Sequence, residues 1–149
     1  MKRVLIIEDN YGVLEENQAL LKANGYTVTL ASSTDRAEQS IEKAETNPFD
    51  CLIIDLNMSN EFLDDGLRKK THGGSLTGWV WLYNIAKPKL HNNPKIIIYS
   101  EFLIELDEEM KNSSEEEREY KDSFVTIAKA DAVNGVDILL NKVNEVFRK

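Results

Sequence analysis

Residues 52–55 read Leu-Ile-Ile-Asp, an apolar run that stops at a carboxylate, and the same arrangement recurs along the chain. Three further runs end in polar residues: Val4-Leu5-Ile6-Ile7 before Glu8-Asp9, Ile96-Ile97-Ile98-Tyr99 before Ser100, and Val125-Thr126-Ile127-Ala128 before Lys129. Short apolar runs without alternation are typical of strands buried on both faces, as in a parallel sheet covered by helices. Helical stretches separate the runs, so the sequence predicts a doubly wound α/β fold.

The remaining elements fit between these runs. Residues 28–30 (Val-Thr-Leu) give a short additional strand, which makes five strands with five helical regions. A helix over 11–24 should stop at Gly25, where a left-handed residue is favoured. Ser33 or Thr34 can cap a helix that runs through residue 44.

Two regions of the chain look enlarged. Residues 59–76 form a long, polar, glycine-containing connection ahead of a helix over 77–87. Loops of this length inside compact domains are usually functional or disordered. After Ser100, one predicted helix is followed by a second helical piece, where Ser114 and Glu117 have the spacing of a capping box.

Size, charge and composition narrow the class of protein. With 149 residues, 42% of them hydrophobic and 30% charged, the chain is expected to be a single domain over 1–149 without an output domain. No apolar stretch approaches the roughly 20 residues that span a bilayer, and no signal peptide is evident, so we expect a cytoplasmic location. The net charge of −8 argues against direct binding of nucleic acid. The single cysteine, Cys51, should be a buried, reduced thiol.

The polar residues that end the runs suggest phosphate chemistry. In a parallel sheet they gather at the carboxyl edge of the strands, where open α/β sheets bind ligands. Glu8, Asp9 and Asp55 cannot all stay ionised there unaided, and Mg²⁺ is the cation that suits such a set of oxygens. With Mg²⁺ bound, Asp55 can act as a nucleophile toward phosphorus. Lys129 can supply positive charge to the phosphoryl oxygens, and Ser100 a hydroxyl donor.

At these positions the chain resembles the receiver domains of two-component response regulators, which have the chemotaxis-type (βα)5 fold. The matching pieces are residues 4–10 (Val-Leu-Ile-Ile-Glu-Asp-Asn), residues 49–58 (Phe-Asp-Cys-Leu-Ile-Ile-Asp-Leu-Asn-Met), Ser100, and Ala128-Lys129. The resemblance covers essentially the whole chain in order. It implies a flavodoxin-like, five-stranded parallel sheet with the strand order 2-1-3-4-5.

The resemblance also implies a role for each matching residue. Asp55 would accept the phosphoryl group, while Asp9, Asp55 and the backbone carbonyl of Asn57 would bind Mg²⁺ and Glu8 would hold the metal through water. Lys129 would pair with the phosphoryl group. Ser100 would move to hydrogen-bond the phosphoryl group, and Thr126 stands at the second switch position. A receiver of this kind transfers a phosphoryl group to its own aspartate and turns over no separate substrate.

Several residues depart from the family pattern. Ser59 replaces the proline that commonly follows the Asp-x-x-Met sequence, and the place of Gly78 indicates that the connection over 59–76 is unusually long. Glu101 stands where a small residue usually follows the switch hydroxyl, and it could narrow access to Asp55 or repel a phosphodonor. Thr126 occupies a position where Tyr or Phe is common. These changes leave the chemistry in place and make the read-out unusual.

Three functions remain in view. The leading one is a stand-alone receiver that is phosphorylated by a histidine kinase or a phosphotransfer protein. It would then signal through an unknown downstream protein or pass its phosphoryl group on. The alternative is a phosphorylation-independent interaction module, a pseudo-receiver with the same fold. A haloacid-dehalogenase-type phosphohydrolase is disfavoured because Asn57 stands where a second Asp is expected. Membrane and nucleic-acid partners are not expected, and homodimer formation on phosphorylation is left open.

Overall fold

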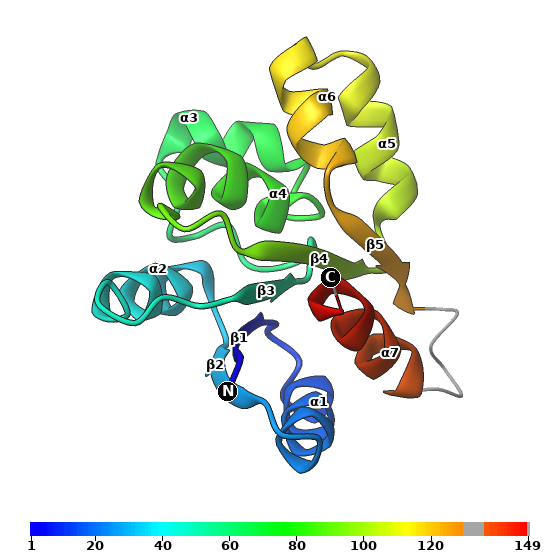
Figure 1. The fold of residues 1–149 in the computed structure, drawn as a ribbon. Coiled ribbons are helices and arrows are strands. Elements are labelled where there is room, and N and C mark those ends of the chain that lie inside the picture. Colours follow the sequence, from blue (N-terminus) through cyan, green and yellow to red (C-terminus); the bar gives the residue numbers. More distant parts are fainter. Residues whose placement is uncertain (130–135, 149) are drawn as a thin grey trace.

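Five strands form one parallel sheet in the computed structural model, which describes residues 1–129 and 136–148. The strands are β1 (Arg3–Ile7), β2 (Thr27–Ala31), β3 (Cys51–Ile54), β4 (Lys95–Ser100) and β5 (Val125–Ala128). Their order across the sheet is β2-β1-β3-β4-β5, and every neighbouring pair is parallel (Figure 1). The predicted flavodoxin-like (βα)5 architecture and its strand order are therefore confirmed.

Helices cover both faces of the sheet (Figure 1). On one face lie α1 (Tyr11–Ala23) and α7 (Val136–Phe147). On the other face lie α2 (Thr34–Lys43), α4 (Thr77–Trp81) and α5 (Leu103–Lys111). Along β1, Val4 and Ile6 pack toward the first layer while Leu5 and Ile7 pack toward the second. Burial on both faces explains why the strands read as continuous apolar runs.

Side-chain caps begin the helices close to where the sequence predicts them. Asn10 accepts a hydrogen bond from the N–H of Val13 at 3.3 Å at the start of α1, and Ser33 caps α2 in the same way. Gly25 follows α1 with a φ of +92°, a conformation that glycine adopts without steric cost. These caps fix where each helix leaves the sheet edge.

The segment 59–76, which the sequence indicates only as a long connection, contains short helical turns. It contains α3 (Asp65–Arg68) and a 3₁₀ turn over Lys69–Thr71. Asp64 caps α3 by accepting the N–H of Leu67 at 2.9 Å. The predicted helix over 77–87 is also subdivided. It consists of α4, a π-helical turn over Leu82–Ala86 and a 3₁₀ turn over Lys87–Lys89.

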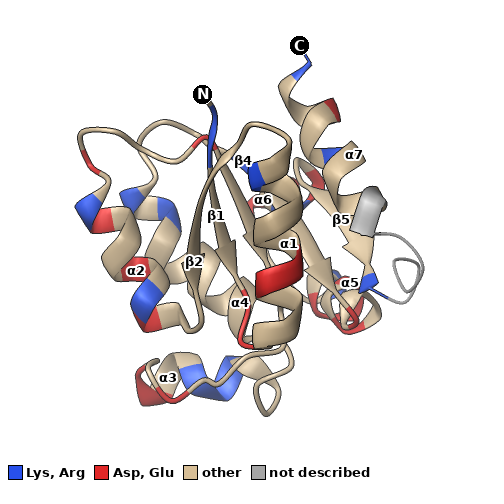
Figure 2. Ribbon diagram, turned by 90° about the horizontal axis from the view of Figure 1, so that it is seen from below, with Lys and Arg blue, Asp and Glu red and all other residues tan. Residues whose placement is uncertain are grey.

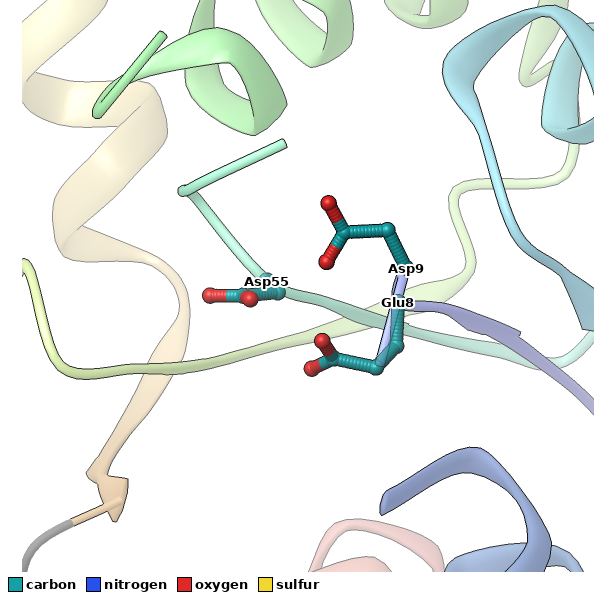
Figure 3. A group of neighbouring side chains, drawn as sticks. All are labelled: Glu8, Asp9 and Asp55. Atoms are coloured by element: carbon teal, nitrogen blue, oxygen red, sulfur yellow. The ribbon is translucent and has the colours of Figure 1, made fainter. Parts of the chain in front are cut away.

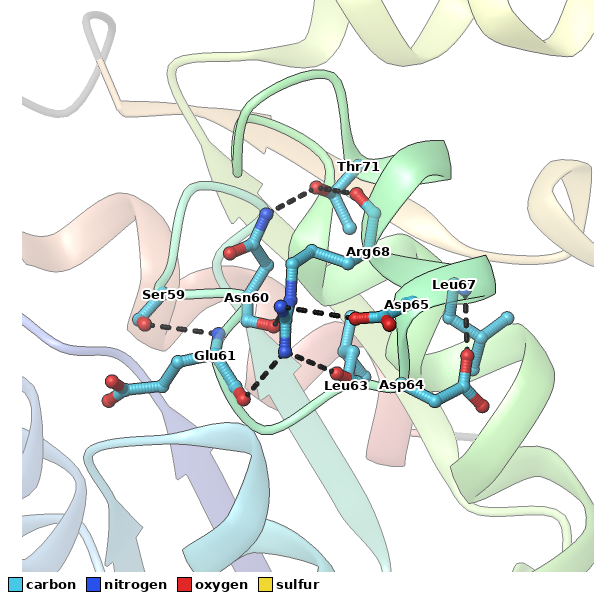
Figure 4. Close-up of polar contacts among 9 residues, drawn as sticks. All are labelled: Ser59, Asn60, Glu61, Leu63, Asp64, Asp65, Leu67, Arg68 and Thr71. Carbon is cyan, nitrogen blue, oxygen red and sulfur yellow. Dashed lines mark hydrogen bonds and ion pairs between the residues drawn. The ribbon is translucent and has the colours of Figure 1, made fainter.

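Arg68 holds the segment 59–76 together (Figure 4). Its guanidinium donates hydrogen bonds to the carbonyl oxygens of Asn60 at 3.3 Å, Glu61 at 3.2 Å and Leu63 at 2.9 Å. It also pairs with the carboxylate of Asp65 at 3.4 Å. A planar guanidinium with five donors can bridge several carbonyl groups at once, which an ammonium cannot do as well. The turn ahead of α3 therefore has a fixed shape.

The region after Ser100 consists of two helices, α5 and α6 (Glu115–Asp122), as the sequence predicts. Ser114 caps α6 by accepting the N–H of Glu117 at 3.2 Å. An aromatic cluster joins α6 to the helical run after α4; its members are Trp79, Tyr83, Tyr120 and Phe124, with ring centroids 4.6 to 6.3 Å apart. The Lys87 ammonium lies within 5 Å of the centroids of Tyr83 and Tyr120, which adds a cation–π contact to this packing.

Charge is distributed unevenly over the helices. Both signs occur on α3 (Figure 2). By contrast, residues 101–122 contain ten of the 26 acidic residues of the chain and only three of its 18 basic ones. The net negative charge is therefore concentrated on the two helices that follow β4. Within the described part of the chain, no helix is both long and apolar enough to cross a membrane.

Candidate functional site

The ends of β1 and β3 hold the candidate carboxylates in place. The N–H of Glu8 donates to the carbonyl of Ala31 at 3.0 Å, which extends the ladder between β1 and β2 by one residue. The N–H of Asp55 donates to the carbonyl of Ile7 at 3.0 Å and extends the ladder between β1 and β3 in the same way. Both side chains therefore leave a fixed backbone at the carboxyl edge of the sheet.

Glu8, Asp9 and Asp55 come together as the sequence predicts (Figure 3). One carboxylate oxygen of each lies within 4.8 Å of one from each of the others. Glu8 and Asp55 are buried, with 3% and 6% of their surface exposed, whereas Asp9 is exposed. Three carboxylates this close repel one another, and burial strengthens that repulsion.

Lys129 partly neutralises the cluster. Its ammonium lies 2.5 Å from Oε2 of Glu8 and 3.0 Å from Oδ2 of Asp55, so it bridges the two buried carboxylates. Burial by itself lowers the pKa of the Lys129 ammonium, but the bond to Glu8 and the charge of Asp55 more than offset it, and the pKa is raised. Lys129 is therefore a fully charged group at neutral pH.

The negative charge of Glu8 remains unfavourable despite its pairing with Lys129. Burial, reinforced by the nearby charge of Asp55, raises its pKa to about 7. The ammonium of Lys129 and the N–H of Asn10, which donates to Oε1 at 3.1 Å, act in the opposite direction. The raised pKa therefore reflects first the burial of the Glu8 carboxyl and second its closeness to Asp55.

Gly78 brings the start of α4 against the backbone of Asp55. Its N–H donates to the carbonyl of Leu56 at 2.9 Å. A Cβ atom on Gly78 would lie 2.1 Å from the carbonyl oxygen of Asp55, closer than any side chain can come. The far end of the segment 59–76 is tied down similarly, since the N–H of Met58 donates to the carbonyl of Gly74 at 3.3 Å. The long connection thus returns to the site at both of its ends.

A small cavity of about 150 Å³, here called the crevice, opens over the carboxylates. It is lined by Glu8, Asp9, Asn10, Asp55, Asn57, Glu101, Phe102 and Lys129. Five of the seven predicted site residues, Glu8, Asp9, Asp55, Asn57 and Lys129, therefore share one opening. Asn57 is exposed there, and its N–H approaches Oδ1 of Asp55 at 3.4 Å.

The two predicted switch residues do not line the crevice. Ser100 is fully buried at the end of β4, and its hydroxyl oxygen accepts a hydrogen bond from the N–H of Phe102 at 3.2 Å. Thr126 is exposed on β5, which is an edge strand of the sheet. Ser100 is in register with Ala128, so the serine lies beside the strand end from which Lys129 emerges.

Two residues near the crevice were not predicted from the sequence. Asn10 lines it and caps α1, and a helix-cap preference was the available signal. The ring of Tyr99 supports Lys129, whose ammonium lies 5.6 Å from the ring centroid. Only the alternation of side chains along β4, which places Tyr99 on the same face as Ile97, could have indicated this.

A comparison with protein families finds a match to the first half of the chain. Residues 4–70 match the family model described as the response regulator receiver domain. This part of the chain is therefore similar to a response regulator receiver domain. The transcriptional regulatory protein ComA of Bacillus subtilis is similar to it, with 26% identity over 107 residues. The match covers 70% of this chain and 42% of ComA, so the chain spans about two fifths of that relative's length. Receiver domains are signalling domains and do not turn over a separate substrate.

Solved receiver structures share the fold across the whole chain. Chemotaxis protein CheY4 of Vibrio cholerae is 19% identical, with a TM-score of 0.64 and 99% of each chain covered. The response regulator TrrA of Thermotoga maritima, solved in complex with Mg²⁺-BeF, is 19% identical with a TM-score of 0.63. That match covers 99% of this chain and 100% of TrrA. At such identities these similarities show the fold alone.

Proposed function

We propose that this chain is a receiver domain that accepts a phosphoryl group on Asp55 in a Mg²⁺-dependent reaction. The observation that carries the proposal is the buried Asp55 carboxylate, which opens to the crevice and lies 3.0 Å from the Lys129 ammonium. A buried carboxylate beside a second buried carboxylate is costly unless it serves a reaction or binds a cation. A structural ion pair alone does not require both Glu8 and Asp55.

The carboxylates of the crevice suit Mg²⁺. Hard oxygen donors from three residues lie within 4.8 Å of one another, and a bound cation would offset the repulsion between the carboxylates of Glu8 and Asp55. Both oxygens of Glu8 already accept protein hydrogen bonds, which fits contact with the metal through water. Asp9 and Asp55, with the carbonyl of Asn57, are the direct ligands in this proposal. Bound Mg²⁺ would neutralise charge on the carboxylates and on the phosphoryl oxygens.

The transfer itself is carried by Asp55 and Lys129. A carboxylate oxygen of Asp55 forms a bond to phosphorus as the bond from phosphorus to the donor's histidine nitrogen breaks, and the nitrogen keeps that electron pair. No proton has to leave Asp55, because it reacts as the carboxylate. Lys129 then exchanges part of its contact with Asp55 for a phosphoryl oxygen, and its charge stabilises the transferring group.

The read-out is proposed to begin at Ser100. Its hydroxyl oxygen accepts the N–H of Phe102 at 3.2 Å, so the hydroxyl proton stays available for donation. Donation to a phosphoryl oxygen would draw the turn between β4 and α5 toward Asp55. Thr126 is proposed as the second switch position. Thr126 is exposed on the edge strand β5. A change in its conformation would therefore alter the surface that a partner protein contacts.

A histidine kinase or a histidine phosphotransfer protein is the proposed phosphodonor. The proposed downstream partner is a protein that binds the surface around Ser100 and Thr126 after phosphorylation. The supporting observations are the family match and the crevice, which is open at the carboxyl edge of the sheet. Direct contact with nucleic acid is not proposed, because the charged surface of the chain is acidic overall.

Intact-mass measurement after incubation with acetyl phosphate and Mg²⁺ tests the proposal. We expect one added phosphoryl group, and none for Asp55→Asn or in the presence of EDTA. Glu119→Gln, which removes an exposed carboxylate of α6, serves as a control that should be phosphorylated normally. Absence of any mass gain in a folded protein that binds Mg²⁺ would instead support the alternative, an interaction module that works without phosphorylation.

A further inference from the structure

Glu101 places a fourth carboxylate in the lining of the crevice. When Glu8 is ionised, these four carboxylates outweigh the single ammonium of Lys129 by three charges. One bound Mg²⁺ would still leave an excess of negative charge. The other lining residues, which are Asn10, Asn57 and Phe102, carry none. An incoming phosphodonor therefore meets a negative opening.

The backbone around Glu101 is fixed, so its position at the opening is a property of the fold. β4 ends at Ser100 and α5 begins at Leu103, which leaves Glu101 in the tight turn between them. The N–H of Phe102 closes this turn on the Ser100 hydroxyl at 3.2 Å, and the carbonyl of Phe102 accepts the N–H of Leu106 at 3.1 Å. Glu101 itself is exposed and, among the described residues, has no basic group within 4 Å.

We propose that Glu101 is a specificity-determining residue that disfavours free anionic phosphodonors and favours a phosphohistidine presented on a basic surface. The inference rests on the proposed phosphorylation of Asp55. A cleft lined by charges of one sign slows the encounter with ligands of the same sign and speeds the encounter with ligands of the opposite sign. Salt screens the charges, so both effects become smaller as ionic strength rises. A free phosphoanion meets only repulsion at Glu101. A donor with lysine or arginine beside its phosphohistidine brings charges that are attracted to the same carboxylate.

Two small phosphodonors of different charge test whether Glu101 repels free anions. Acetyl phosphate is a dianion at neutral pH, and phosphoramidate carries one net negative charge. For Glu101→Gln, which keeps the shape and removes the charge, we expect about threefold to tenfold faster phosphorylation by acetyl phosphate at low ionic strength. The gain should be smaller with phosphoramidate and should shrink for both donors as salt is added.

Two synthetic peptides test whether Glu101 attracts a basic phosphodonor. In one peptide the phosphohistidine is flanked by lysines, and in the other it is flanked by glutamates. The wild-type domain should react faster with the lysine-flanked peptide, and Glu101→Gln should bring the ratio of the two rates toward one. Calorimetric titration with Mg²⁺ gives a readout that is independent of phosphorylation. There the same variant should bind Mg²⁺ up to about threefold more weakly, because it has lost a nearby negative charge.

Two further variants separate the local effect from other causes. Glu105→Gln removes an exposed carboxylate of α5 that does not line the crevice, and it should change these rates little. An equal effect of Glu105→Gln would mean that the general field of the acidic helices acts, and would overturn the assignment to Glu101. Acceleration by Glu101→Ala but not by Glu101→Gln would show that side-chain bulk limits access, and would overturn the charge argument.

The remaining outcomes are equally decisive. Identical rates for wild type and Glu101→Gln at every salt concentration would refute the inference while leaving the proposed function intact. No phosphorylation of any variant by any of these donors would refute the proposed function, and the inference with it.

Discussion

The crevice and the segment 59–76, which begins just after the crevice residues Asp55 and Asn57, pair their charged groups in opposite ways. In the crevice, whose lining holds four carboxylates, the ammonium of Lys129 pairs with only two of them, Glu8 and Asp55. In the segment 59–76, Arg68 is matched by three carbonyl groups and one carboxylate (Figure 4). One region is left with excess charge, and the other is satisfied by its own backbone.

This difference separates the residues that specify structure from those that await a ligand. Polar groups that find partners within the chain stabilise a shape, and a substitution there is felt as lost stability. Polar groups left in excess lower stability and are retained for binding or reaction. We therefore expect substitutions in the two regions to change stability in opposite directions.

Gly78→Ala should cause the largest effect, because it acts where the two regions meet. The added Cβ would lie 2.1 Å from the carbonyl oxygen of Asp55, so either α4 or the acceptor residue has to move. We expect a loss of about 3 kcal/mol or more in the free energy of unfolding, measured by urea denaturation. Gly66→Ala in α3 is the matched control, since its Cβ would meet nothing closer than 3.5 Å. A similar loss in both variants would contradict the close approach at Gly78.

Arg68→Met should loosen the segment 59–76 without unfolding the domain. It removes the donors to three backbone carbonyls and should cost about 1–2 kcal/mol locally. Hydrogen exchange of the amides around α3 should then be faster, while Mg²⁺ affinity stays unchanged. The exchange rates in Arg68→Lys should lie between those of the wild type and Arg68→Met. Lys69→Met should leave the exchange rates unchanged. Weakened Mg²⁺ binding in Arg68→Met would show that the two regions are not separate.

Asp9→Asn should raise the stability of the metal-free domain, whereas the two preceding substitutions lower it. Removing one of three crowded carboxylates relieves repulsion, so the metal-free domain should gain up to about 1 kcal/mol, or roughly 2–4 °C in Tm. The same variant should lose the additional stabilisation that Mg²⁺ gives the wild type. Thermal unfolding with and without Mg²⁺ measures both changes. A metal-free Asp9→Asn variant that is less stable than wild type would mean that Asp9 has a structural role.

The pKa of Glu8 predicts the smallest effect, a modest pH dependence. Since the folded pKa is about 7, raised from 4.5, the proton on Glu8 contributes stability that is fully present below pH 4.5 and lost as pH rises through 7. Mg²⁺ favours the deprotonated form, so its affinity should rise by about threefold between pH 6 and 8, with proton release below pH 7. Calorimetry in two buffers of different ionisation enthalpy detects the protons, and Glu8→Gln should abolish the dependence.

The sheet and the grouping of the crevice residues were accessible from the sequence, for a common reason. Burial on both faces makes β3 an unbroken apolar run, so its end at Ile54 marks where Asp55 emerges. Parallel strands then bring the residues after β1, β3 and β5 to one edge, whatever the details of the helices. The proximity of Glu8, Asp55 and Lys129 follows from topology alone.

The structure of the segment 59–76 could not be predicted, because its contacts leave little trace in the sequence. Arg68 bonds to backbone carbonyls, which every residue type provides, so no pattern of side chains points to its partners. Asp64 ahead of α3 is a genuine cap signal, but it precedes a helix of only four residues. The support of Lys129 by Tyr99 is likewise a tertiary contact between two strands and has no local signature.

The most direct test of phosphoryl acceptance is to identify the atom that carries the group. An aspartyl phosphate is reduced by borohydride to homoserine, a change that tandem mass spectrometry locates within a peptide. After phosphorylation with acetyl phosphate and Mg²⁺, we predict homoserine at position 55 and at no other aspartate, Asp9 included. Modification at Asp9, or at Asp64 or Asp65 at the start of α3, would contradict the assignment of Asp55 as the acceptor. An unmodified Asp55 in a domain that binds Mg²⁺ would contradict it equally.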